Sequence, residues 1–128
     1  LNASGAFGGG EVNVGGGFQG NDDSVSNSQS TVINDGARIS VDSSILGDAG
    51  RAVIWSDGST MFRGDISARA AGLSGNGGLI EVSGQETLEF RGRANTTAAN
   101  GAVGTLLLDP SDVVIGPSGG AVTRLTRI

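Results

Sequence analysis

The 128-residue sequence contains no cysteine, lysine, histidine or tyrosine, and only two prolines. Without cysteine, neither a disulfide framework nor a thiolate metal site can form. The missing residue types also include most side chains that serve as a general base or a nucleophile. Stability must therefore come from packing and hydrogen bonding, and we expect no catalytic, cofactor-binding or metal-binding residue.

The charge balance is acidic. All eight cationic residues are arginine, and they stand against 13 acidic residues, which gives a net charge of −5. This balance disfavours a nucleic-acid partner and an anionic membrane. No apolar run approaches the ~20 residues of a membrane-spanning helix, so we expect no membrane insertion. Because the first residue is Leu1 rather than methionine, we expect a fragment of a longer protein.

Glycine is abundant, with 24 copies, and it recurs in step with short apolar runs. Residues 75–96 align without a gap onto residues 47–68, a shift of 28 positions. Four segments open with glycine and continue as an alternating strand pattern, at spacings of 40, 28 and 26 residues. Repeat lengths of this size indicate stacked coils. The four segments begin at Gly10, Gly50, Gly78 and Gly104.

Alternation along these segments assigns their side chains to two faces of a strand. Glu81 is predicted to point outward and to set the register of its strand, because a slip of one residue would bury its carboxylate. The predicted inward residues form two columns, Val12, Ala52, Ile80 and Leu106 in the first and Val14, Ile54, Val82 and Leu108 in the second.

A second strand in each coil is predicted to end in a Phe-x-Gly triplet. Stacking would place Phe18, Phe62 and Phe90 in one interior column, where burial of each ring contributes about 2–3 kcal/mol. A third strand supplies the inward pairs Ile39/Val41, Ile66/Ala68 and Ala94/Thr96, with Leu1/Ala3 as the same strand of the preceding coil. Three short strands per coil and no helical periodicity predict an all-β fold, a parallel β-helix (β-solenoid) of about four coils.

The same register predicts two contacts on the outer surface. Arg93 falls beside Asp65, which is a favourable cross-strand pair, and Arg91 falls beside Arg63, which is an unfavourable one. Each contact contributes at most about 1 kcal/mol, so the inward columns decide the fold.

The polar run at residues 21–30, NDDSVSNSQS, interrupts the repeat and accounts for most of the long first spacing. Insertions of this kind lie outside a solenoid as loops. We therefore expect residues 1–110 to form the coils, with a loop insertion at 21–30. Residues 111–128 are expected to form a terminal strand and tail, or the start of another module.

Four segments of the sequence resemble the repeats of filamentous haemagglutinin-like exoproteins of bacterial two-partner secretion. They are GGGEVNVGGGFQG, RAVIWSDGSTMFRGDISARA, GNGGLIEVSG and NGAVGTLLLDPSDVVI, of which GTLLLDP at residues 104–110 is the most specific. The resemblance implies a right-handed β-helix, export through a dedicated outer-membrane transporter, and a role in adhesion, biofilm formation or display of a terminal toxin. The amino-terminal secretion domain of that family is not part of this sequence.

The tripeptide Arg63-Gly64-Asp65 is a motif that integrins bind on exposed loops. Here it occupies the repeated Phe-Arg-Gly corner, and residues 91–93 fill the equivalent place without aspartate. A coincidence of the repeat is the favoured interpretation, and receptor contact requires that both charged side chains be exposed.

Two other motifs have simpler interpretations. Residues 15–20 satisfy G-x-G-x-x-G, but no apolar helical stripe follows, so a turn is favoured over a dinucleotide site. Residues 21–23 and 34–35 offer oxygen ligands for calcium, but acids do not recur at coil spacing, so a loop and an Asp-Gly turn are favoured.

Trp55 is predicted to point outward, where an exposed indole could stack on a sugar. More often such a tryptophan is partly covered by a neighbouring loop or a repeat mate, and this interpretation is favoured. Catalysis on an acidic polysaccharide would need facing carboxylates. The outward acids Asp57, Glu81, Glu86 and Glu89 are more simply interpreted as a solvated surface.

These observations favour a structural shaft segment of a secreted or cell-surface bacterial adhesin, which is not an enzyme. A glycan- or receptor-binding module, with the 21–30 loop and Trp55 as contacts, or a stalk for a toxin is the alternative, and a polysaccharide-acting enzyme ranks last. Strand edges at the two ends also predict end-to-end self-association. Pro117, Arg124 and Arg127 would blunt one of these ends.

Overall fold

The computed structural model describes residues 1–109, 112–115 and 125–127, the last two segments through their backbone alone. Its strands form three parallel sheets. The first contains β1 (Glu11–Val14), β4 (Arg51–Ile54), β7 (Leu79–Val82), β10 (Thr105–Leu108) and β12 (Leu125–Arg127). The second contains β2 (Ser30–Ile33), β5 (Ser59–Phe62), β8 (Thr87–Phe90) and β11 (Asp112–Ile115). The third contains β3 (Arg38–Ser40), β6 (Asp65–Ser67) and β9 (Arg93–Asn95).

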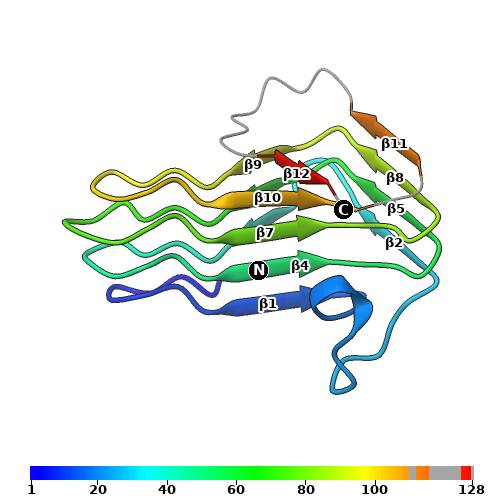
Figure 1. The fold of residues 1–128 in the computed structure, drawn as a ribbon, viewed down its shortest axis with the longest axis horizontal. Coiled ribbons are helices and arrows are strands. Elements are labelled where there is room, and N and C mark those ends of the chain that lie inside the picture. The colour runs from blue at the N-terminus through cyan, green and yellow to red at the C-terminus, as the bar shows by residue number, and fades with distance from the viewer. Residues whose placement is uncertain (110–111, 116–124, 128) are drawn as a thin grey trace.

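The chain visits the sheets in turn, so that each strand pairs with its equivalent one coil away (Figure 1). The predicted parallel β-helix of about four coils, with three short strands per coil, is confirmed. Pairing continues beyond residue 110, because β11 pairs with β8 and β12 pairs with β10. Pro110, Ser111, Pro117 and Arg124 lie outside the described residues.

The inward columns of the first sheet have the predicted register. Ala52 pairs with Ile80, which pairs with Leu106, and all three side chains are buried. Val12 and Val14 occupy the same columns in the first coil and are partly buried against the core. Aliphatic side chains therefore fill the tube, as expected for the close packing typical of protein interiors. The polar backbone groups of these strands are paired within the sheets, as their burial requires.

Two phenylalanines of the second sheet stack inside the tube. The rings of Phe62 and Phe90 have centroids 5.3 Å apart and planes only 7° apart. The predicted third ring, Phe18, is wrong, because Ile33 pairs with Phe62 in the first coil. Phe18 instead begins a short 3₁₀ helix, η1 (Phe18–Gly20), where the guanidinium of Arg51 lies 5.4 Å from its ring centroid.

The predicted position of Phe18 is wrong because the insertion begins earlier in the chain than expected. Strand β1 ends at Val14 and β2 begins at Ser30, so the insertion comprises residues 15–29 rather than 21–30. In Figure 1 this blue segment leaves the stack beside β1, whereas later coils pass directly to the second sheet. The triplet at Phe18 therefore imitates the repeat without occupying its place in the coil.

The third sheet agrees with the prediction. Ile39, Val41, Ile66, Ala68, Ala94 and Thr96 are buried. Asn2 forms a parallel bridge with Ser40, so residues 1–3 extend this sheet by one coil, although Leu1 is 71% exposed.

The recurrent glycines have a physical cause in the close approach of successive coils. A Cβ at Gly50 would lie 1.9 Å from the carbonyl oxygen of Gly10, and one at Gly92 would lie 2.2 Å from that of Gly64. Neither glycine has a left-handed φ angle, so space rather than backbone conformation selects the residue. The sheets meet at corners that exclude a side chain.

Candidate functional site

The Arg63-Gly64-Asp65 tripeptide lies at the corner between β5 and β6. Arg63 follows the last residue of β5, and Asp65 is the first residue of β6. Both charged side chains are exposed, as receptor contact requires, whereas Gly64 is buried. A Cβ at Gly64 would lie 2.7 Å from the carbonyl oxygen of Ala37. Packing of the coils accounts for this glycine, and a receptor role for the tripeptide stays a prediction.

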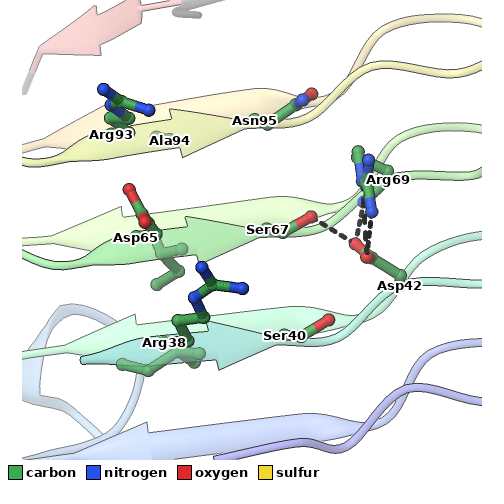
Figure 2. Close-up of a pocket in the computed structure, with 11 residues that line it drawn as sticks. Arg38, Ser40, Asp42, Asp65, Ser67, Arg69, Arg93, Ala94 and Asn95 are labelled. Atoms are coloured by element: carbon green, nitrogen blue, oxygen red, sulfur yellow. Dashed lines mark hydrogen bonds and ion pairs between the residues drawn. The ribbon is translucent and has the colours of Figure 1, made fainter. Parts of the chain in front are cut away.

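Asp65 belongs to a polar face formed by outward side chains of β3, β6 and β9 (Figure 2). Its register partners on the two neighbouring strands are Arg38 and Arg93. The predicted neighbour relation of Arg93 and Asp65 is therefore confirmed. A second row of small polar side chains follows along the same strands, formed by Ser40, Ser67 and Asn95.

Asp42 and Arg69 complete this face just beyond the ends of β3 and β6. The Arg69 Nη2 atom lies 3.1 Å from Asp42 Oδ2, and the Arg69 backbone N–H donates to Asp42 Oδ1 at 2.6 Å. The Ser67 hydroxyl donates to the same carboxylate (Figure 2). Partial burial opposes ionisation of Asp42, but the hydrogen bonds from Ser67 and Arg69 outweigh it and lower the pKa of this carboxyl.

These side chains line a shallow groove of about 460 Å³. Three arginines and two aspartates border it, so the groove carries a small net positive charge on a chain whose net charge is −5. Asp42 is engaged with Arg69, which leaves Arg38 and Arg93 flanking a single aspartate. Guanidinium groups such as these bind carboxylate, sulfate or phosphate oxygens. The groove can therefore accept an anionic group.

Arg63 and Arg91, at the corner between the second and third sheets, share the carboxylate of Glu89. Arg91 lies beside Arg63, as predicted, because Phe62 and Phe90 are register partners. Glu89 is hydrogen-bonded to Arg91 and lies 3.8 Å from Arg63 Nη2. This carboxylate offsets the repulsion that the sequence predicted for the two cations.

Trp55 is only 6% exposed, so the interpretation that a neighbouring loop covers the indole is confirmed, and the exposed indole needed for stacking on a sugar is not present. The insertion packs against its ring, where a Cβ at Gly16 or Gly20 would lie about 2.5 Å from indole carbons. The indole N–H donates to Asp57 Oδ1 at 2.9 Å, and Asn27 donates to the same oxygen. The indole is therefore part of a packed contact and offers no open stacking surface.

Glu81 points outward as predicted, but it is 0% exposed, so its interpretation as a solvated surface residue is wrong. In the register of the sheet it lies between the buried aliphatic residues Val53 and Leu107. The Gln19 backbone N–H donates to Glu81 Oε1 at 2.7 Å, and the Ser83 hydroxyl donates to Oε2 at 2.9 Å. The insertion thus covers this carboxylate on the outside of the tube.

Burial raises the pKa of the Glu81 carboxyl, although the two hydrogen bonds oppose the rise. Asp109 adds to the increase and Arg51 counteracts it. Gln19 reaches the carboxylate with a φ of 54°, a left-handed conformation that is unfavourable for a residue other than glycine. The contact therefore holds both a desolvated acid and a strained residue. The sequence signal for it was the presence of apolar Val53 and Leu107 at outward positions.

Pairs of hydroxyl groups stabilise the corner between the first and second sheets. The sequence pattern did not predict them. Thr60 donates to the Ser83 carbonyl and bonds to Ser56, both at 2.7 Å. One coil earlier, Thr31 makes equivalent contacts with the Trp55 carbonyl and Ser28. Each buried hydroxyl therefore links consecutive coils.

The remaining motifs form turns. Residues 15–20 end in the three-residue η1, which is too short to provide a helix dipole for a phosphate. Asp22 accepts hydrogen bonds from the backbone N–H and hydroxyl of Ser24, and these lower its pKa. Within residues 1–109 and the two later described segments, no cluster of three or more acidic side chains is arranged to hold a metal ion.

No protein-family model matches this chain, and no curated protein matches its sequence. In the part of the chain that the structure describes, no helix has the length and hydropathy needed to cross a membrane.

Proposed function

We propose that the chain is a shaft segment of a secreted bacterial surface adhesin of the filamentous haemagglutinin-like kind. Its role is mechanical, to extend a rigid rod from the cell and to display loops. The supporting observation is that each of the three sheets pairs in parallel from coil to coil through the described strands. Hydrogen bonds that run along the axis join each coil to the next in all three sheets, which is the arrangement that a rigid rod requires.

Side-chain contacts inside the tube support the same role. The stacked rings of Phe62 and Phe90, and the hydroxyl contacts of Thr31 and Thr60, all join one coil to the next. In a repeat array of this kind, stability is approximately a sum of terms between neighbouring coils. A shaft can then be lengthened without a new core.

The proposal includes export through an outer-membrane transporter and a location outside the cell. Each coil that emerges would find a template in the coil before it, so folding would proceed from one end and draw the chain outward. It includes no catalytic role.

End-to-end self-association belongs to the same proposal. Strand β1 ends the order of the first sheet and β2 that of the second, so each has one edge without a neighbouring strand in the described part of the chain. Such edges pair readily with other strands. Arg127, expected to blunt the opposite end, lies in β12 beside Leu108.

Duplication of one coil tests the shaft proposal. A second copy of residues 51–78, inserted after Gly78 in the full-length protein, preserves the register, because Arg51 and Leu79 are ladder partners. We expect export and cell-surface attachment to persist and the rod to lengthen by about 4.8 Å per inserted copy. The matched control is the same insertion with Ile54 and Ile66 replaced by aspartate, which should block export. Equal export of both insertions would refute the proposal.

The groove on the third sheet supports a second function, which is contact with an anionic glycan or receptor. Arg38, Asp65 and Arg93 are exposed there in one row. Binding of acidic glycans should fall when Arg38 and Arg93 are both replaced by glutamine. Replacement of Arg51, which lies on the first sheet, is the control and should leave binding unchanged. A glycan could stack on Trp55 only after the insertion has moved away from the indole ring.

A further inference from the structure

Four loops connect the third sheet back to the first, and they stack at one side of the rod (Figure 1). Large apolar side chains at the tips of the first three loops are exposed: Phe7 at 70%, Ile45 at 47%, Leu46 at 42% and Leu73 at 79%. These four residues are called the apolar stripe. The fourth loop adds Val103, nearer to β10, at 50%.

Hydrogen bonds between the loops hold the stripe in place. The Ile45 N–H donates to the Ala6 carbonyl at 2.8 Å, and the Leu73 N–H donates to the Ile45 carbonyl at 2.7 Å. Asn100 continues the series through a side-chain bond to the Gly72 carbonyl at 2.9 Å. The loop tips therefore repeat along the axis in the same way as the strands.

Nothing inside the tube requires these apolar residues. The interior is filled by other side chains, and no member of the stripe belongs to the core cluster or packs against it. Polar residues at the tips would cost less in solubility, and a row of exposed apolar side chains commonly marks an interaction surface.

The stripe also lacks charge. Segments 43–47 and 70–78, and the loop residues 5–10 and 98–104, contain no acidic or basic residue, although the whole chain has a net charge of −5. The nearest charges are the Asp42–Arg69 ion pair and Asp48, which accepts a hydrogen bond from Asn76. Two copies of the chain can therefore approach each other along this side with little electrostatic repulsion.

We propose that the apolar stripe is a lateral contact surface for a second copy of this chain, so that two rods pack side by side. A second copy matches the stripe because its own tips repeat with the same coil spacing, about 4.8 Å, and can interdigitate along the whole length. The absence of arginine, lysine and tyrosine from the tips fits an anionic membrane poorly. This contact is distinct from pairing of strand edges at the ends.

The buried area sets the expected strength. The stripe comprises four side chains with exposed fractions between 42% and 79%, which is a small surface for an interface between two proteins. A stable dimer usually buries about 800 Å² per partner. Association of the 128-residue chain through this surface should therefore be weak and concentration-dependent. It should strengthen in a longer rod wherever the added loops also carry exposed apolar side chains at their tips.

Sedimentation analysis over a range of concentrations tests the contact. The double variant Phe7→Asn/Leu73→Asn should raise the dissociation constant for self-association roughly tenfold or more. Met61→Asn is the matched control, since Met61 is a partly exposed outward residue of β5, a strand that is paired on both sides and lies away from the stripe, and its replacement should change the constant less than about twofold. Circular dichroism checks that both variants fold, as expected for exposed positions.

Three results would overturn the inference. Association of unchanged strength in the double variant would place the contact at the strand edges instead. An equal effect of Met61→Asn would show that the stripe has no special role. A monomeric chain that binds neutral phospholipid vesicles, and loses this binding in the double variant, would assign the stripe to a lipid surface.

Discussion

The two middle coils and the first coil have the same order of strands, but they differ in the segment that connects the first sheet to the second. In residues 51–68 and 79–96, every strand has its repeat partner, and the apolar side chains alternate into the tube. In the first coil, the 15–29 insertion folds back over the outer surface and buries Trp55 and Glu81. Repetition thus determines the interior, whereas a single insertion creates a second buried region outside the tube.

The two regions differ in what burial requires. Inside the tube, burial involves mostly aliphatic and phenyl groups, whose transfer from water is favourable in itself. Under the insertion it also involves a carboxylate, which is tolerated because Gln19 and Ser83 donate hydrogen bonds to it. The interior should therefore be the more stable region, and the insertion the more sensitive to pH and to single changes.

The largest effect is expected inside the tube. Phe62→Ala removes a fully buried ring and its stack on Phe90, and should lower the free energy of unfolding by about 3–5 kcal/mol. Phe18→Ala is the matched control outside the tube and should cost less than about 1 kcal/mol, mainly the contact with Arg51. Chemical denaturation measures both. Similar costs for the two changes would contradict the distinction between the regions.

A smaller and local effect is expected at Trp55. Trp55→Ala should cost about 2–3 kcal/mol, at or below the low end for a buried indole, because the insertion can partly collapse into the space. Hydrogen exchange should accelerate at the Gln19 amide, which lies in the insertion, and stay slow at the amides of β8. Accelerated exchange throughout β8 would show that the insertion supports the whole rod.

The pH dependence of stability separates the regions further. The folded pKa of Glu81 is raised above 4.5, so the folded state binds the proton more tightly than the unfolded state. Between the unfolded and the folded pKa of Glu81, stability therefore falls as the pH rises. Glu81→Gln should remove this slope and leave the protein at least as stable at pH 7. An unchanged slope would refute the role of this carboxyl.

Asp42 on the third sheet provides an internal control with the opposite sign. Its folded pKa is lowered below 3.8, so its contribution to stability is present above that pH and is lost as the pH falls through the folded value. The Glu81 window lies above 4.5 and the Asp42 window lies below 3.8, so the two do not overlap.

The smallest effect is expected at the corner between the second and third sheets. Glu89→Gln leaves Arg63 beside Arg91 without their shared carboxylate, and should cost about 0.5 kcal/mol at low ionic strength, less when salt is added. Glu86→Gln is the control, because no ion pair of Glu86 is found among the described residues. Equal and salt-independent costs would show that the corner arginines do not repel each other.

The coil could be predicted from the amino-acid pattern, because period-two alternation and the 28-residue shift specify which side chains enter the tube. The columns through Ile80 and Val82, the pair Phe62 and Phe90, and the neighbours Asp65 and Arg93 all follow from that pattern. The polar face of the third sheet could likewise be predicted in part, since register alone aligns its outward residues.

The residues that the insertion covers could not be predicted from this pattern, because they depend on long-range packing. Most of residues 15–29 have no counterpart in the shorter connections of the later coils, so alternation cannot tell where this segment packs, and it misplaced Phe18 and left Glu81 in solvent. Period-two alternation distinguishes the two faces of a strand, but it carries no information about a segment that later covers one face. The burial of an outward side chain depends on that segment, and therefore on contacts between residues far apart in the chain, such as Gln19 and Glu81.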